Sequence, residues 1–167
     1  MLRPFRSGDA SDVFEYGSDP EFAFFATNAP PLTIEAAREK IERVLATPWS
    51  TRACFAITLD ERVIGSVELE PDWPNLTANL GYEVARSRWG QGIATEAAIA
   101  VIAYGFERLE LAKIHARVDP RNVSSVRVLE KLGMTREGLL RSHLVRRGER
   151  VDRASYGLLK EDWSPAR

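Results

Sequence analysis

The chain has 167 residues, of which 44% are hydrophobic and 28% charged, so at about 100–200 residues per domain it is long enough for one domain with a sizeable core. Its 23 basic and 24 acidic residues leave a net charge of −1, which argues against a nucleic-acid partner because general nucleic-acid-binding proteins are usually basic. A single cysteine excludes an intrachain disulfide, and two distant histidines give no recognisable metal site. No apolar run reaches the roughly 18–20 residues of a membrane span, so we expect a single cytoplasmic domain over residues 1–167.

The first half of the chain contains two helical patterns and four strand patterns. In chain order, we expect a strand over 1–5, helices over 9–16 and 34–46, and strands over 53–59, 63–69 and 76–84. Thr33 is a good N-cap for the second helix, whose apolar residues follow helical spacing. Asp60-Glu61-Arg62 predicts a hairpin turn between two of the strands, and Pro71 and Pro74 are expected to break the chain before the next strand.

An unusually aromatic segment, Glu21–Phe25, lies in the stretch between the first two helices. Prolines punctuate this stretch on both sides of the segment, which predicts a loop. The aromatic side chains either pack in the core or form one wall of a substrate cleft. For the second interpretation, Phe24 and Phe25 are the candidate residues.

The second half of the chain alternates helical and strand patterns. We expect a long apolar helix that begins after Gly92, a strand over 113–118, a helix over 123–132 and two strands over 135–145 and 150–159. The long helix is apolar on more than one face, which indicates burial on most sides, and Gly133 is the expected residue after the end of the next helix. Consecutive strands combined with strand–helix–strand crossovers predict an α+β fold with a mixed sheet, because a doubly wound parallel sheet requires stricter alternation.

The segment from Gly81 to Ala97 carries the strongest functional pattern. A strand runs into Gly90-Gln91-Gly92, and a helix begins at once. Glycines let the backbone approach a ligand, and the unpaired N–H groups of a helix start favour an anion such as a pyrophosphate. A P-loop is excluded because Ile93 stands where that motif has lysine. Two alternatives remain for this segment. One is a dinucleotide-binding fingerprint, although Thr95 stands where that motif has its third glycine or alanine, and the other is a tight turn with a purely structural role.

Two motifs resemble those of the Gcn5-related N-acetyltransferases (GNAT). Trp89-Gly90-Gln91-Gly92-Ile93-Ala94 is similar to motif A of this family, Gln/Arg-x-x-Gly-x-Gly/Ala, with Trp89 in place of the first Gln or Arg. Asn122–Met134 resembles the Asn-x-x-Ser…Glu-Lys-x-Gly-Phe segment of the ribosomal-protein N-alpha-acetyltransferase (RimJ/RimL-like) subgroup, with Met134 in place of Phe. The resemblance spans nearly the whole chain and is weakest at 19–31. It implies the GNAT fold, a mixed sheet of about six or seven strands with a splay between the fourth and fifth strands and about four flanking helices.

The resemblance implies acetyl-CoA as cosubstrate and no metal. Backbone N–H groups of the glycine loop would hold the pyrophosphate, and a backbone N–H near Val84 would face the thioester carbonyl as an oxyanion donor. Asn122 is either only the N-cap of the following helix or an additional contact to the pantetheine arm. The implied acetyl-CoA-binding residues are Val84, Trp89, Gly90, Gln91, Gly92, Ile93, Ala94, Thr95, Asn122 and Ser125.

The candidate catalytic residues are Ser125 and Glu83. Many members of the superfamily place a tyrosine beside the CoA sulfur, but the matching position here is Leu129, which makes Ser125 the better candidate for protonating the leaving thiolate. The alternative for Ser125 is a hydroxyl satisfied by the backbone. Glu83 is the acid nearest in sequence to the active strand, and it is either the general base for the amine or a salt-bridged strand residue. Glu68 and Glu70, on the neighbouring strand, are the other candidates for the base.

We expect acetyl transfer from acetyl-CoA to a primary amine, by direct attack of the amine on the thioester. The subgroup resemblance implies a protein N-terminal α-amine as acceptor, and a small-molecule amine is the second candidate. Loops at 22–32 and 142–150 would read the acceptor, and the candidate acceptor-binding residues are Phe24, Phe25, Tyr82 and His143. A catalytically silent acyl-CoA-binding module and a dinucleotide-binding protein are the alternative functions.

Arginines are concentrated on the last two predicted strands and the turn between them. They are Arg136, Arg141, Arg146, Arg147, Arg150 and Arg153. These cations form either a solvated face balanced by neighbouring acids, or a surface that contacts an acidic substrate or the second subunit of a homodimer.

Overall fold

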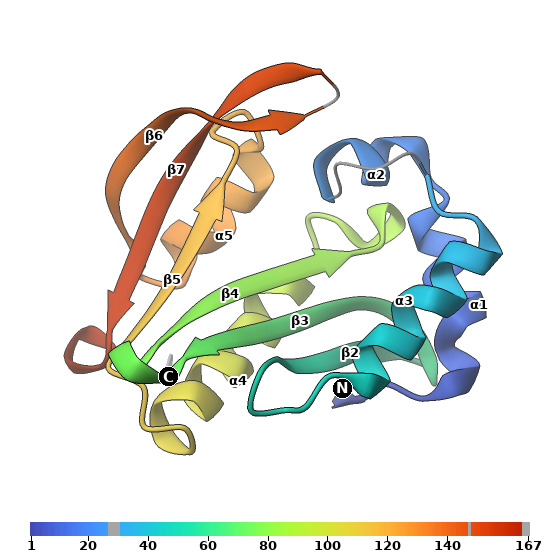
Figure 1. Ribbon diagram of the computed structural model, residues 1–167, viewed down its shortest axis with the longest axis horizontal. Helices are drawn as coiled ribbons and strands as arrows, with labels where there is room; N and C mark the ends of the chain where they lie inside the picture. The colour runs from blue at the N-terminus through green and yellow to red at the C-terminus, as the bar shows by residue number, and fades with distance from the viewer. Residues whose placement is uncertain (27–30, 147, 165–167) are drawn as a thin grey trace.

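The computed structural model describes residues 1–26, 31–146 and 148–164, except for the side chains of Phe25 and Ala26. These residues form a twisted seven-stranded sheet with helices on both faces (Figure 1). Along the sheet the strands follow the order β1 (Leu2–Pro4), β2 (Ala53–Leu59), β3 (Arg62–Asp72), β4 (Thr77–Val84), β5 (Lys113–Val118), β7 (Glu149–Leu159) and β6 (Thr135–Arg146). The helices are α1 (Ala10–Gly17), α2 (Pro20–Ala26), α3 (Ile34–Ala46), α4 (Ile93–Glu107) and α5 (Val123–Lys131). The predicted α+β class with a mixed sheet is confirmed.

The first four strands form an antiparallel meander. Asp60 and Glu61 connect β2 to β3 with φ values of 49° and 63°, as a two-residue turn with left-handed residues requires. The expected break at Pro71 is wrong, because β3 continues to Asp72 and pairs with β4 from Gly65 to that residue. The pairing of β2 with β3 ends at Leu69, so Pro71 lies where β3 has a neighbour on one side only, and there a strand tolerates proline.

The aromatic segment predicted as a loop is the helix α2. Asp19 caps it, since its Oδ1 accepts hydrogen bonds from the backbone N–H groups of Glu21 at 2.8 Å and Phe22 at 3.1 Å. Pro20 occupies the first helical position, where its missing N–H costs nothing. Phe22 is 1% exposed and packs edge-on against a tyrosine of α1, whereas Phe24 is 42% exposed. The described residues therefore contain a fifth α-helix beyond the four expected.

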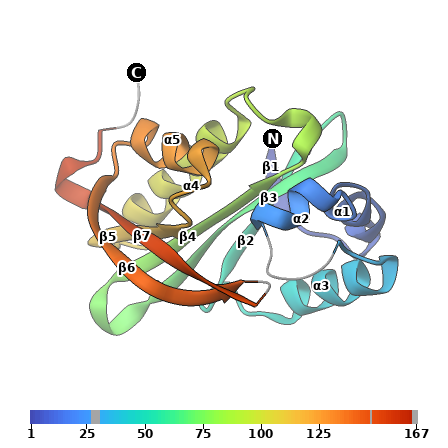
Figure 2. The same ribbon diagram turned by 90° about the horizontal axis from the view of Figure 1, so that it is seen from above.

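Each face of the sheet has its own hydrophobic cluster. Helices α4 and α5 cover one face, and α1, α2 and α3 cover the other (Figure 2). In β4, Leu80 and Val84 belong to the cluster of α4 and α5, while the side chain of Glu83 contacts α1 and α3. Neighbouring residues of β4 thus serve opposite faces of the sheet. None of the described helices is long and apolar enough to cross a membrane.

Strands β4 and β5 splay apart towards their carboxyl ends (Figure 1). They pair in parallel from Thr77 with Lys113 to Asn79 with His115, although β4 continues for five more residues to Val84. The N–H of Ala85 donates to the carbonyl of Ile64 on β3 at 2.7 Å. Because the backbone N–H and C=O groups of successive strand residues point to opposite edges, this bond shows which residues of β4 face β3 and which face the splay. By that alternation, the backbone N–H and C=O groups of Tyr82 and Val84 point into the splay. The predicted splay between the fourth and fifth strands is confirmed.

Candidate active site

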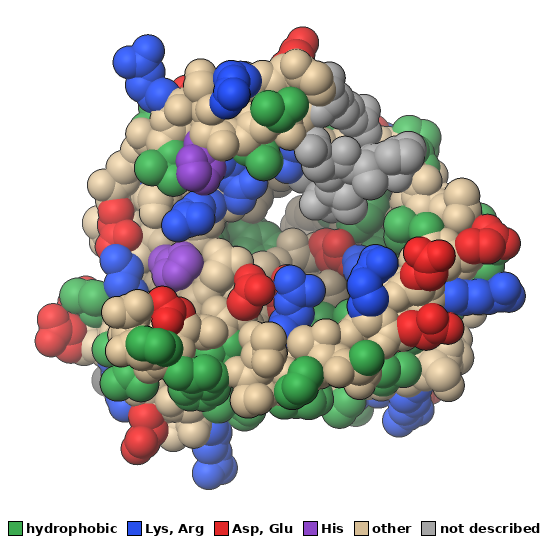
Figure 3. Space-filling view, viewed as in Figure 1, with side chains coloured by type: hydrophobic (Ala, Val, Ile, Leu, Met, Phe, Trp, Pro, Cys, Tyr) green, Lys and Arg blue, Asp and Glu red, His purple; other side chains and the backbone are tan. Residues whose placement is uncertain are grey.

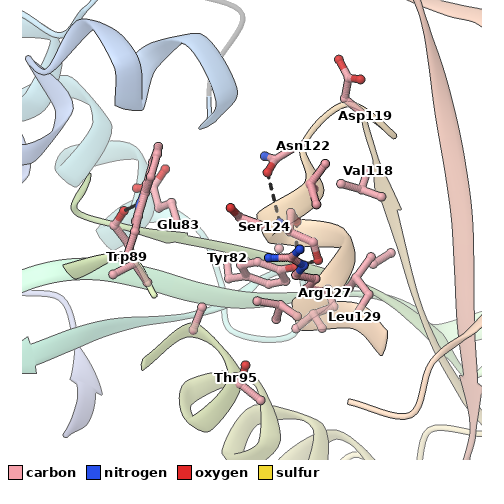
Figure 4. Close-up of a pocket in the computed structure, with 18 of the residues that line it drawn as sticks. Tyr82, Glu83, Trp89, Thr95, Val118, Asp119, Asn122, Ser124, Arg127 and Leu129 are labelled. Atoms are coloured by element: carbon pink, nitrogen blue, oxygen red, sulfur yellow. Dashed lines mark hydrogen bonds between the residues drawn. The ribbon is translucent and has the colours of Figure 1, made fainter. Parts of the chain in front are cut away.

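A cavity of about 670 Å³ occupies the splay (Figure 4). Its walls come from β4, the loop after β4, the first turn of α4, the end of β5 and α5, with Phe22 of α2 at one side. Basic residues predominate among the charged groups that line it: Arg88, Arg117, Arg121, Arg127, Lys131, Arg146 and Arg153, against Glu83 and Asp119. This volume lies within the range of small-molecule sites, which is roughly 300–1,000 Å³.

The glycine loop is open towards the cavity. Gly90 and Gly92 have φ values of 76° and 81°, a conformation that favours glycine. A Cβ atom built on either residue would meet no other atom within 4 Å, so the space in front of both is empty of protein. Gly92 is the N-cap of α4 and offers no side chain to the first-turn N–H groups, which leaves them available to a ligand. The loop and the start of the 15-residue helix therefore have a geometry that can bind an anion.

Trp89 fixes the loop to the end of β4. Its indole Nε1 donates a hydrogen bond to the backbone carbonyl of Val84 at 2.7 Å, so the carbonyl on the splayed edge is satisfied by a side chain of the loop. The neighbouring Gln91 donates instead to the carbonyl of Ser87 at 3.2 Å, and it is not among the residues that line the cavity. The contribution of this loop to a ligand site thus comes from its backbone and from the Trp89 ring.

Tyr82 and Ser125 form a hydroxyl pair across the cavity. Their oxygens lie 2.8 Å apart, and the Tyr82 hydroxyl also donates to the backbone carbonyl of Ser125 at 3.1 Å. Burial raises the pKa of Tyr82 to about 12, so the phenol stays protonated at neutral pH. Asn122 caps α5, since its Oδ1 accepts from the N–H of Ser125 at 3.1 Å. The capping role predicted for Asn122 is confirmed, and Ser125 has a side-chain partner as well as a capped backbone.

Glu83 lies on the other face of β4, where two side chains hold it. The hydroxyl of Tyr16 donates to its Oε1 at 3.0 Å, and the ammonium group of Lys40 donates to the same oxygen. The carboxylate is 14% exposed and lines the cavity, and its Oε2 has no partner among the described residues. Glu68 and Glu70 lie away from the cavity and each reach Arg52 at 3.8 Å. Of the three candidate acids, the structure brings only Glu83 to the cavity.

The structure places the other acceptor candidates less centrally. Phe24 is exposed on α2 and His143 is exposed on β6, and neither is among the residues that line the cavity. The side chain of Phe25 lies outside the described residues, as do 27–30 in the loop expected to read the acceptor. Sequence reasoning missed Phe22 as a lining residue, although it considered the aromatic segment that contains it.

Comparison with known proteins identifies the family. The model of a family described as an acetyltransferase (GNAT) domain matches residues 1–135. The chain belongs to the GNAT acetyltransferases. It is 34% identical over 167 residues to the uncharacterized N-acetyltransferase p20 of Bacillus licheniformis, covering 98% of this chain and 94% of p20. It is 32% identical over 88 residues to the [ribosomal protein uS5]-alanine N-acetyltransferase of Escherichia coli, covering 53% of this chain and 45% of that enzyme.

The fold of this GNAT protein agrees with solved structures. RimJ of Mycobacterium smegmatis, in complex with CoA-disulfide, superimposes with a TM-score of 0.86 at 26% identity, over 96% of this chain and 82% of RimJ. The protein is therefore an acetyl-CoA-dependent N-acetyltransferase, and the resemblance read from the two sequence motifs is confirmed. The strand order also differs from that of the doubly wound dinucleotide-binding fold.

Proposed function

We propose that this GNAT enzyme transfers the acetyl group of acetyl-CoA directly to the N-terminal α-amine of a protein. The observation that carries the proposal is the position of Tyr82 and Glu83. Tyr82 meets Ser125 on the face of α5, Glu83 meets Lys40 on the face of α3, and both residues line the one cavity in the splay. An acyl donor on the first face and an amine on the second would therefore meet at β4.

The donor half of the cavity fits acetyl-CoA. The N–H groups of the loop from Trp89 to Ala94 would bind the pyrophosphate, and the empty space before the two glycines gives the phosphates access to them. The backbone N–H and C=O groups of Tyr82 and the N–H of Val84, which point into the splay, would bind the amide groups of the pantetheine arm as a neighbouring strand does. Arg127 and Lys131 on α5 supply positive charge on this side.

The chemistry needs a proton acceptor and a proton donor. The amine nitrogen attacks the thioester carbonyl carbon, a C–N bond forms, and the carbonyl oxygen gains a negative charge that the N–H of Val84 stabilises. Glu83 takes the proton of the amine, directly or through water, by its unpartnered Oε2. The C–S bond then breaks, and the hydroxyl pair of Ser125 and Tyr82 hydrogen-bonds to the CoA thiolate and passes it a proton. The pair regains a proton from solvent, and Glu83 releases to solvent the proton that it took from the amine. The products are the acetylated amine and CoA.

The choice of a protein N-terminus rests on the relatives. The E. coli relative acts, by its name, on the alanine of ribosomal protein uS5, and RimJ is among the structures that superimpose well. A small-molecule amine is the second candidate, because the cavity volume of about 670 Å³ suits a small acceptor as well.

Titration of the purified protein with acetyl-CoA, and with NAD as control, tests the donor site. We expect calorimetric binding of acetyl-CoA with a Kd of about 1–100 μM and no binding of NAD. Acetylation of N-terminal peptides, followed by CoA release, then tests the acceptor class. Absence of acetyl-CoA binding would contradict the proposal at its first step.

Replacement of Ser125 by alanine is expected to lower kcat and leave the Kd of acetyl-CoA nearly unchanged. A thiol has a pKa near 8.5, so its thiolate leaves readily and a proton donor contributes modestly, about 10²-fold or less. Tyr82→Phe, which keeps the ring and the Ser125 hydroxyl, should lower kcat by less. Steady-state rates of CoA release give kcat for both variants. If kcat is the same in Ser125→Ala and wild type, Ser125 only packs and has no role in the reaction.

A further inference from the structure

The cavity contains a second group of cations that the acetyl donor does not explain. Arg117 on β5, Arg146 on β6 and Arg153 on β7 line its wall opposite β4. On the face of the sheet that carries α1, α2 and α3, the molecule is hollowed between β4 and the β6–β7 hairpin (Figure 3). Lys and Arg side chains gather on the hairpin side of this hollow, and an acidic side chain lies across it.

Arg153 projects towards the acceptor face. Its neighbour Ala154 is 1% exposed in the cluster packed against α4 and α5, so the alternation along β7 directs Arg153 to the face that also carries Glu83. The Nη2 atom of Arg153 donates to the backbone carbonyl of Arg117. The hydrogen bond from the N–H of Lys113 to the carbonyl of Leu76 fixes the alternation of β5 and turns the Arg117 carbonyl towards β4. The guanidinium therefore reaches across β5 to the edge of the splay.

No carboxylate among the described residues forms a hydrogen bond or ion pair with Arg153, whose guanidinium donates to a backbone carbonyl. Its Nε is buried without a hydrogen-bond partner among the described residues. Burial lowers the pKa of its guanidinium, the positive charges of Arg146 and Arg117 lower it further, and the negative charge of Asp119 offsets only part of this effect. The carboxylate of Asp119 is already engaged by Arg121, whose Nη2 donates to Oδ2 at 2.7 Å and whose Nε donates to Oδ1 at 3.0 Å. A partly buried cation beside two others is costly unless an anion arrives, which points to a negatively charged ligand.

We propose that Arg153, flanked by Arg146 and Arg117, binds a carboxylate carried by the acceptor, while Glu83 binds its amine. This assignment rests on the proposed function. The two walls of the hollow then recognise the two charges of one molecule: the carboxylate of Glu83 attracts an ammonium group, and the guanidinium of Arg153 offers two donors to a carboxylate. A polyamine would bring a second cation against the arginine wall and is disfavoured.

The phosphates of the donor do not account for these arginines. The residues suited to the phosphates are Arg88 beside the glycine loop and Arg127 and Lys131 on α5, which lie on the α4–α5 side of the cavity. Arg153 and Glu83 lie on the opposite face of the sheet. The carboxylate has two chemical sources, the α-carboxylate of a free amino acid or the acidic side chain of a residue near a peptide N-terminus.

Matched acceptor pairs test the assignment by CoA release. One pair is a free amino acid and its amide, and the other is a blocked-carboxyl peptide with glutamate or glutamine at its second position. For one of the pairs we expect kcat/KM to be about tenfold or more higher for the charged member. The pair that shows the preference identifies the source of the carboxylate.

Variants of Arg153 connect the preference to this residue. Arg153→Gln should raise the KM of the charged acceptor about 10-fold to 100-fold and leave that of its neutral partner unchanged, and Arg153→Lys should restore part of the loss. Arg153→Glu should reverse the preference towards the neutral member. Arg141→Gln, an exposed arginine of β6 that does not line the cavity, is the control and should match wild type.

The outcomes separate this assignment from the proposed function. If the enzyme turns over amines without discriminating within either pair, or if Arg153→Gln and Arg153→Lys raise the KM of both members equally, the carboxylate subsite is refuted while acetyl transfer stands. If acetyl-CoA fails to bind in the calorimeter, or if it binds and no peptide N-terminus releases CoA, the proposed function is refuted instead. A preference lost in Arg153→Gln and retained in Arg141→Gln supports the subsite.

Discussion

Replacing Gly92 by valine is expected to weaken acetyl-CoA binding by about 100-fold or more. The Cβ of a residue at this position projects into space where no other atom lies within 4 Å, which is the space assigned to the pyrophosphate. The branched side chain would block the approach of the phosphates to the loop N–H groups, and hydrogen bonds to a charged group contribute roughly 1.5–3 kcal/mol each, so the loss of two of them reaches this factor. Calorimetric titration with acetyl-CoA measures the change.

Gly133→Val is the matched control for Gly92→Val. Gly133 follows α5 with a φ of 76°, close to the 81° of Gly92, and a Cβ there also meets no atom within 4 Å. Both variants therefore pay the same left-handed backbone strain, about 1–2 kcal/mol of folding stability, but Gly133 does not line the cavity. We expect equal losses of thermal stability and a loss of binding in Gly92→Val alone. Equal binding in the two variants would show that the glycine loop does not hold the donor.

Much of the fold could be predicted from local sequence patterns. Thr33 accepts a hydrogen bond from the N–H of Ala36 at 3.2 Å, and α3 begins at the next residue, as the capping pattern predicts. The α2 helix was not predicted because a seven-residue helix has too few turns to show a periodic pattern, and the flanking prolines favoured a loop. Pro71 was misjudged because the sequence does not reveal where the neighbouring strand stops. Local sequence patterns do not predict a strand boundary that depends on where the neighbouring strand ends.

The same distinction between local patterns and long-range contacts applies to the site. The glycine loop was predictable, because its chemistry lies in consecutive residues that meet at the start of one helix. The pairing of Tyr82 with Ser125 joins residues 43 positions apart, and that of Glu83 with Tyr16 joins residues 67 apart, so neither partner could be named from spacing. Arg153 was visible only as one of several arginines on the last hairpin. Its reach across β5 depends on the registers of two strand pairs, which only the folded sheet specifies.

The Glu83→Gln variant is expected to lower kcat/KM for the amine by about 10²-fold or more, within the range of 10²–10⁴ for a lost general base. Glutamine has nearly the same shape, and its carbonyl oxygen can still accept the hydrogen bonds of Tyr16 and Lys40, so the walls of the cavity should keep their positions. Burial, the largest cause, and the charge of Glu83 raise the pKa of Tyr16 well above its usual range. Burial remains in the variant, so this phenol stays a donor and cannot replace the base. The variant thus removes the negative charge and the proposed proton acceptor together, while the proposed acetyl-CoA site on the other face is untouched.

Glu70→Gln is the matched control for Glu83→Gln. Glu70 carries the same carboxylate on β3, is paired with Arg52 at 3.8 Å, and does not line the cavity, so its variant should retain wild-type rates. Rates of CoA release over a series of amine concentrations, with acetyl-CoA saturating, separate the two contributions of Glu83. A rise in the KM of the amine alone would mean that the carboxylate binds the ammonium and that water takes the proton, whereas a fall in kcat means that Glu83 takes the proton itself. Wild-type values of both constants in Glu83→Gln would place the acceptor elsewhere in the splay and leave Glu83 as a structural partner of Lys40.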